Sequence, residues 1–170
     1  MNKKRIQLTL FVEENESEII EKIRKEFNPV QHELIKSHVT LCRENELEKI
    51  EIVTRNLAAL HHHYITIHFG ALERFSNGKG LMIPATDDNE QFQKLREIIL
   101  QTAVKDPVKL HPHITLMHPR NSTCTDSLFE QIEKIKIPAT LEFRKISLIE
   151  QEEENKWAVL KEFDLKPAYL

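Results

Sequence analysis

The sequence predicts an α+β protein built from a duplicated unit, and two observations predict this fold class. The first is a short motif, His-apolar-Thr-Leu, which occurs at His38–Leu41 and again at His113–Leu116. The second is the order of elements, because each half of the chain reads as strand, helix, His/Thr strand, helix and long strand. Helices that cover one face of each sheet leave the other faces free to form a central cleft.

The first half begins with a strand and a helix. Apolar residues alternate over 6–12, which favours a half-buried strand. Apolar residues at helical spacing over 19–27 indicate a helix that ends at Asn28-Pro29. We expect a loop between this helix and the first His/Thr strand.

A second helix and a further strand complete this half. Asn45 and Glu48 have the spacing of a capping box, and apolar residues over 47–57 continue at helical spacing. Alternation over 65–69 predicts the strand. The segment Ser76–Gly80 is the clearest turn in the chain and joins two extended segments.

The second half repeats this order, so the halves of the pseudo-repeat are about 1–76 and 80–170. The elements expected in it are a strand over 81–84, a helix over 92–99, the second His/Thr strand, a helix over 128–135, a long strand over 141–148 and a last strand over 157–165.

The composition is typical of a globular domain and limits the choice of partner. The chain has 170 residues, 40% hydrophobic and 30% charged, so we expect one domain over 1–170. A net charge of -3 argues against binding to long nucleic acid, but a small phosphate-bearing ligand needs only local cations. Cys42 and Cys124 form no CxxC motif, which favours a reducing, cytoplasmic location. No stretch approaches transmembrane length, and nothing requires more than a monomer.

Strand geometry brings the polar residues of each motif to one surface. Side chains of a strand alternate between its faces, so His38 and Thr40 share one face while the residues between and after them face the core. His113 and Thr115 do the same in the second copy. If the two active faces meet, these four side chains line the cleft.

Two histidines that face one cleft suit general acid–base catalysis near neutral pH. One imidazole can take a proton from an attacking oxygen while the other gives a proton to the leaving oxygen. The hydroxyls of Thr40 and Thr115 can hydrogen-bond the oxygens of a phosphate held between them. A single His-x-Thr is more often a surface or packing feature. Two copies in matching context favour in-line displacement at a phosphodiester.

The two motifs resemble the signature of the two-histidine (2H) phosphoesterase superfamily, which includes bacterial 2′-5′ RNA ligases and cyclic phosphodiesterases. That family has two His-x-Thr/Ser tetrapeptides, the second commonly preceded by proline, as Pro112 precedes His113 here. Residues 146–150 and 157–163 are similar to its closing hairpin. The resemblance implies a bilobal, LigT-like α+β fold with pseudo-two-fold symmetry, two antiparallel-rich sheets and an active site between the lobes.

The resemblance also implies an activity. It implies hydrolysis or formation of 2′-linked phosphodiesters, commonly the opening of a 2′,3′-cyclic phosphate on a small nucleotide or RNA terminus, without a metal ion or other cofactor. By the same resemblance His38 and His113 are the acid–base pair, and Thr40 and Thr115 hold the phosphate. Which histidine is the acid does not follow from the sequence. The alternative is a nucleotide-binding module of the same fold with little or no turnover.

Residues beside the motifs are candidates for substrate contacts. His111 shares the strand parity of His113 and could reach the cleft. Arg120 and Arg43 each follow a motif and could clamp a phosphate, although both could be surface charges. Strand parity places Arg43 off the active face unless the strand ends at Cys42, whose thiol we expect to be buried.

Three candidates lie farther from the motifs. Phe11 has the cleft parity of its strand and Phe75 precedes the glycine turn, so either could stack on a base, although each could belong to the core. Lys79, between two glycines, could reach a phosphate or simply increase solubility. The run His61–His63 lies at a helix-to-strand junction, and no cysteine or carboxylate recurs at zinc spacing. We therefore predict no metal site.

Overall fold

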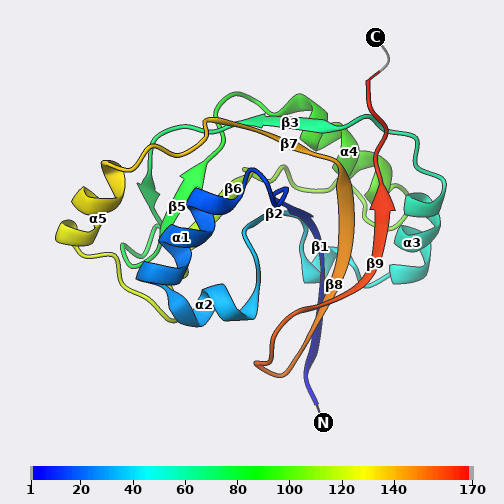
Figure 1. Ribbon diagram of the computed structural model, residues 1–170. Coiled ribbons are helices and arrows are strands. Elements are labelled where there is room, and N and C mark those ends of the chain that lie inside the picture. The colour runs from blue at the N-terminus through cyan, green and yellow to red at the C-terminus, as the bar shows by residue number, and fades with distance from the viewer. Residues whose placement is uncertain (1, 169–170) are drawn as a thin grey trace.

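Antiparallel β-structure dominates the computed structural model, which describes residues 2–168 (Figure 1). A seven-stranded sheet has the strand order β4-β5-β6-β2-β1-β8-β9, and β3 and β7 form a separate two-stranded sheet. The strands are β1 (Lys4–Phe11), β2 (His38–Cys42), β3 (Ile65–His68), β4 (Glu73–Arg74), β5 (Leu81–Pro84), β6 (His113–Met117), β7 (Thr140–Phe143), β8 (Lys145–Glu152) and β9 (Ala158–Asp164). The predicted α+β class is confirmed.

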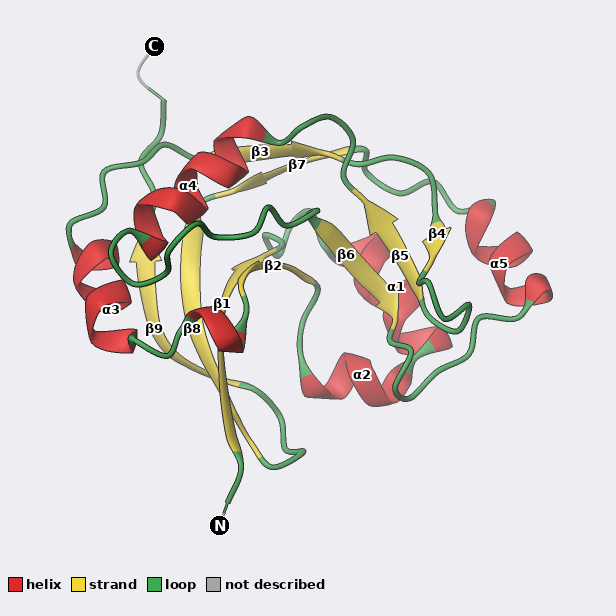
Figure 2. Ribbon diagram, turned by 180° about the vertical axis from the view of Figure 1, so that it is seen from behind, coloured by secondary structure: helices red, strands yellow, loops and turns green. Residues whose placement is uncertain are grey.

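The helices lie on both sides of the strands of the two lobes (Figure 2). They are α1 (Glu18–Phe27), α2 (Pro29–Leu34), α3 (Ile50–Ala58), α4 (Glu90–Leu100) and α5 (Asp126–Glu133), with a 3₁₀ turn η1 (Glu44–Glu46). Helices α3 and α4 lie near β8 and β9, whereas α1 and α2 lie near β5 and β6. Among residues 2–168, no helix is long and apolar enough to cross a membrane.

The two His/Thr strands are neighbours at the centre of the large sheet. Strand β2 pairs antiparallel with β6, and the register joins Val39 to Ile114, the corresponding residue of each motif. Strand β1 flanks β2 and strand β5 flanks β6. Beyond them the halves exchange strands, since β8 and β9 lie on the side of β2 and β4 lies on the side of β6. We expected the motifs on facing walls of a cleft. The structure instead places them edge to edge, because β2–β6 pairing makes the two half-sheets continuous.

The strand pairings on either side of the junction match residue by residue. In each half the register shifts by one residue directly after the motif threonine. This irregularity buries Cys42 and Met117 beside the motif leucines and returns the next residues, Arg43 and His118, to the side of the motif histidines. The two motif strands thus have equivalent pairings with their outer neighbours. The matched pairs are Phe11–His38, Leu10–Val39 and Thr9–Thr40 in one half and Pro84–His113, Ile83–Ile114 and Met82–Thr115 in the other.

Two buried arginines tie each half to the motif strand of the other. Arg24 of α1 donates from Nε to the carbonyl of Thr115 at 3.2 Å, and Arg96 of α4 donates from Nη1 to the carbonyl of Leu41 at 2.5 Å. Both arginines are only 1% exposed. Each guanidinium also forms an ion pair, and the partners are Glu21 and Glu46 respectively. Buried charge of this kind is tolerated because the hydrogen bonds are nearly all satisfied.

Three local expectations are wrong. The expected loop after α1 contains α2, because Pro29 suits the first position of a helix as well as the end of the previous one. The capping box does not use Glu48; instead the carboxylate of Glu46 accepts from the Arg43 N–H, and α3 begins only at Ile50. The single long strand over 141–148 is divided between β7 and β8, which belong to different sheets.

The buried pair between Arg96 and Glu46 provides a stability test. We expect Arg96→Ala to lower the free energy of unfolding by about 3–5 kcal/mol, because it leaves the Glu46 carboxylate and two main-chain carbonyls without their donor. Lys94→Ala is the control, since Lys94 lies on the same helix and its ion pair with Glu90 is exposed. That substitution should cost at most about 1 kcal/mol. Equal losses in denaturant unfolding would contradict the assigned role of Arg96.

Candidate active site

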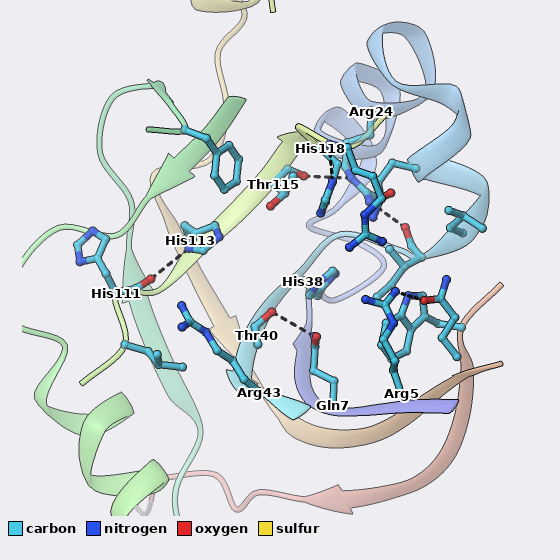
Figure 3. A pocket seen from close by; sticks show the side chains of 18 residues that line it. Arg5, Gln7, Arg24, His38, Thr40, Arg43, His111, His113, Thr115 and His118 are labelled. Atoms are coloured by element: carbon cyan, nitrogen blue, oxygen red, sulfur yellow. Dashed lines mark hydrogen bonds between the residues drawn. The ribbon is translucent and has the colours of Figure 1, made fainter. Parts of the chain in front are cut away.

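The four motif side chains meet in one cavity of about 350 Å³ (Figure 3). His38 and Thr40 enter it from β2, and His113 and Thr115 enter it from β6. The strand parity of both motifs is as expected, since the residues between them, Val39 and Ile114, are fully buried on the opposite face. The pairing of β2 with β6 therefore sets the two histidines side by side in one site.

Each motif imidazole is held by the main chain two residues before it. Nδ1 of His38 lies 2.7 Å from the carbonyl oxygen of Lys36, and Nδ1 of His113 lies 3.1 Å from that of His111. A carbonyl oxygen can only accept, so Nδ1 carries the hydrogen in both rings. In the neutral imidazoles Nε2 then keeps its lone pair and can take up a proton.

An aromatic ring packs against each imidazole in the same manner. The centroids of Phe11 and His38 are 6.0 Å apart with the rings at 69°, and those of Phe75 and His113 are 5.6 Å apart at 84°. Both are edge-to-face contacts, which restrict rotation of the imidazoles. Phe75 lines the cavity, whereas Phe11 lines a neighbouring one. Phe11 thus packs against His38 and does not line the cavity in which we expected it to stack on a nucleobase.

The hydroxyl of Thr40 is oriented by Gln7, which sequence patterns alone did not single out. The side-chain amide of Gln7 donates to Oγ1 of Thr40 at 3.1 Å and to Oγ1 of Thr9 at 2.7 Å. Because Thr40 accepts this bond, its own O–H is available to donate to a ligand. Alternation along β1 places Gln7 on the face of Phe11, but only the register with β2 shows that it reaches Thr40.

Cations line the cavity, and none of the carboxylates of residues 2–168 lines it. Its charged and titratable lining residues are Arg5, Arg24, Arg43, Arg120, His38, His111, His113 and His118. This is a concentration of positive charge in a chain whose net charge is -3. The arrangement suits a phosphate group, which arginine recognises through paired N–H donors.

The structure brings most of the predicted contact residues to this cavity. Arg43, His111 and Arg120 line it, and Arg43 does so because the register shift reverses its parity. Lys79 is exposed in the turn between β4 and β5 and does not line it. Residues not singled out from sequence also line the cavity, and they include Arg5, Gln7, Arg24, His118, Gln151 and Trp157. His118 could have been found, since it occupies the place after the second motif that Arg43 occupies after the first.

Burial and nearby cations keep both motif histidines neutral. Burial lowers the pKa of His38 to about 4, against the opposing hydrogen bond to Lys36, and the charges of Arg24 and His113 lower it further. Burial also lowers the pKa of His113, and His111 and Arg43 add to this effect. Both imidazoles of the unliganded site are therefore bases at pH 7.

The cysteine beside the first motif has a different environment. Burial raises the pKa of the Cys42 thiol to about 12, so the thiolate is not available as a nucleophile. Cys42 faces the core rather than the histidines, as the register shift requires. Within residues 2–168, no three His, Cys, Asp or Glu side chains are grouped as ligands for a metal ion.

Comparison with known proteins identifies the class to which this fold and site belong. The family model of the 2′-5′ RNA ligase superfamily matches residues 11–155, and the chain belongs to this family. A search of curated proteins gave no match.

Solved structures show the same fold at low sequence identity. Escherichia coli LigT in complex with phosphate superposes with a TM-score of 0.63 at 15% identity, covering 98% of this chain and 99% of LigT. Its complex with 3′-AMP gives 0.64 at 15% identity, with the same coverage. The protein TT0787 of Thermus thermophilus gives 0.55 at 14% identity, covering 97% of this chain and 100% of TT0787.

The lowered pKa of His38 predicts how stability depends on pH. An unfolded histidine titrates near about 6.5, so between this value and about 4 the unfolded chain binds a proton that the folded site rejects. The free energy of unfolding should therefore fall as the pH falls from 7 to 4. We expect His38→Asn to reduce this fall, as measured by denaturant unfolding at each pH. Parallel curves for the variant and the wild type would contradict the assignment.

Proposed function

We propose that this protein is a phosphodiesterase that acts on a 2′,3′-cyclic phosphate or a 2′-5′ linkage of a nucleotide or RNA end. The observation that carries the proposal is the pair of imidazoles, each fixed at Nδ1 by a main-chain carbonyl, in one cavity with two threonine hydroxyls. General acid–base catalysis needs such a pair, with one group to take a proton and another to give one. The proposed mechanism uses no metal ion or other cofactor.

The proposed hydrolysis of a cyclic phosphate proceeds in one in-line displacement. One neutral imidazole takes a proton from water as the water oxygen bonds to phosphorus. The bond from phosphorus to one ribose oxygen breaks, and the imidazolium of the other histidine gives that oxygen its proton. Thr40 and Thr115 donate to the non-bridging oxygens, where negative charge gathers. The product is a phosphomonoester with a free ribose hydroxyl. A joining reaction would be the same displacement with the 5′ hydroxyl of a second RNA end in place of water, and its product would be a 2′-5′ phosphodiester.

Two observations support a phosphate ligand, namely the positive charge of the cavity and the ligands of a protein with the same fold. Arg24 and Arg43 approach the motif residues, since their positive charges act on His38 and His113 respectively. LigT, which has the same fold, has been crystallised with phosphate and with 3′-AMP. A nucleotide with a phosphate on its ribose 2′ or 3′ oxygen is thus the simplest substrate for this cavity.

Removal of either motif histidine tests the proposal. We expect His38→Ala and His113→Ala each to lower kcat for a nucleoside 2′,3′-cyclic phosphate by about 10²–10⁴-fold, because each removes one proton-transfer step. Turnover by the wild type should persist in excess EDTA. The control is His68→Ala, since His68 lies on β3 away from the cavity and bonds to Thr140.

The other outcomes of this experiment identify the alternatives. Nucleotide binding without turnover by the wild type would favour the nucleotide-binding module. Activity that disappears with EDTA and returns with zinc would overturn the metal-free mechanism.

The pH profile provides an independent test. The reaction needs one proton on the histidine pair, and the pKa of both histidines in the free site is lowered below the usual value. The kcat/KM profile reports the free enzyme, so its maximum should lie below about pH 6.5. Bound phosphate favours the imidazolium and raises its pKa, so kcat should peak at higher pH. Maxima of both profiles together above pH 7 would contradict the assigned protonation states.

A further inference from the structure

Arginines without a carboxylate partner are concentrated in the cavity. Within residues 2–168, four of the eight arginines form ion pairs with glutamate or aspartate, namely Arg24, Arg74, Arg96 and Arg144. The remaining four are Arg5, Arg43, Arg55 and Arg120, and all of these except Arg55 line the cavity. Unpaired arginines in one cavity repel each other unless a ligand brings negative charge. Their number exceeds what a single reacting phosphate monoester or diester requires.

These cations surround the motif histidines in the cavity (Figure 3). Arg43 and His111 both act on His113 and lie together at one end in Figure 3. In the same view Arg5 lies on the side of His38 away from His111, and His118 lies above His38 beside Thr115. Burial lowers the pKa of His118, and the charges of Arg120 and then Arg5 lower it further, so both arginines lie near this imidazole. Arg5 and Arg120 line the same cavity as His118, from β1 and from the loop after β6 respectively.

The guanidinium of Arg5 is held rigidly by its neighbours. Arg5 pairs with Gln151 across β1 and β8, and its Nη2 donates to the side-chain oxygen of Gln151. The guanidinium carbon lies 5.3 Å from the centroid of the Trp157 ring, which is a cation–π contact. A planar guanidinium fixed in this way keeps donors free for an anion and loses little side-chain entropy on binding.

Arg5 is too far along the sheet to share the reacting phosphate with Thr40. Thr9 pairs with Thr40, and Arg5 lies four residues from Thr9 on β1, which is roughly 14 Å along the strand. The arginine side chain spans only part of this separation. The remaining gap is of the size of a ribose, so Arg5 fits a second anionic group on the same ligand.

The neighbouring cavity does not suit a second phosphate. This cavity of about 640 Å³ shares Trp157 with the first, but five glutamates line it, namely Glu13, Glu14, Glu21, Glu33 and Glu162, against three lysines. A phosphate chain that passed Trp157 into it would meet like charge. A second phosphate that stays in the first cavity avoids these glutamates and can contact Arg5 and Arg120.

We propose that Arg5 and Arg120, beside His118, form a second phosphate subsite, which binds the phosphate on the 5′ oxygen of the ribose whose 2′,3′-phosphate reacts. The inference rests on the proposed function, because that function places the reacting phosphate at the motif residues. It narrows the substrate class to an RNA end or a 5′-phosphorylated nucleotide. A nucleoside 2′,3′-cyclic phosphate with a free 5′ hydroxyl would leave this subsite empty.

Binding of two defined ligands tests the subsite without relying on turnover. We expect the wild type to bind adenosine 3′,5′-bisphosphate at least tenfold more tightly than adenosine 3′-monophosphate in calorimetric titrations, since a charge-assisted hydrogen bond contributes this much. Arg5→Gln and Arg120→Gln should each remove most of that ratio. Arg55→Gln is the matched control, because Arg55 is also unpaired but lies on α3 outside the cavity.

Further readouts separate this inference from the proposed function. Equal affinity of the wild type for both ligands, or equal losses for both ligands in Arg5→Gln, would overturn the subsite. Thermal unfolding checks that Arg5→Gln folds. Because Arg120 is exposed, Arg120→Gln tests the same subsite at a position where a substitution should not disturb folding. The rates of turnover are measured for adenosine 2′,3′-cyclic phosphate and for its 5′-phosphorylated form. Failure of both as substrates would overturn the phosphodiesterase, whereas the binding ratio would still decide the subsite.

Discussion

The pairing of β2 with β6 at Val39 and Ile114 is the contact on which the candidate active site depends. Each residue follows a motif histidine directly, so this one register fixes how far apart the two imidazoles lie. The buried guanidinium groups of Arg24 and Arg96 reinforce the junction, since each bonds to the opposite motif strand. Backbone hydrogen bonds and buried ion pairs, rather than contacts between the histidines themselves, thus hold the two motif histidines in place.

The register shift after each threonine explains how Arg43 and His118 reach the site. Without it, strict alternation would bring Cys42 and Met117 to the cleft and turn Arg43 and His118 towards the core. With it, one polar residue follows each motif on the active face, and two apolar residues, the motif leucine and the residue after it, fill the core behind. One irregularity in the backbone therefore both completes the core and supplies charge for phosphate.

The sequence was sufficient for the motif residues and for most elements, because alternation and helical spacing are local patterns. It was not sufficient for features that arise from pairing between distant segments. The register with β2 determines that Gln7 reaches Thr40, and the approach of β8 and β9 determines that Arg5 lies against Trp157. The division of 141–148 between two sheets was missed for the same reason. Lys79 does not line the cavity, and the sequence could not show this because flanking glycines indicate a turn but not its direction.

The exchange of buried arginines has a consequence for how the chain could be divided. Each guanidinium finds main-chain acceptors in both halves. Arg24 donates to the carbonyls of Ile35 and Thr115, and Arg96 donates to those of Leu41 and Val108. A separated half would keep its arginine but lose a carbonyl that the guanidinium needs. Its motif strand would also have an unpaired edge where β2 meets β6. We expect such fragments to associate through this edge and to become ordered only when the two halves recombine. The intact chain should therefore fold as one cooperative unit, although its halves resemble each other.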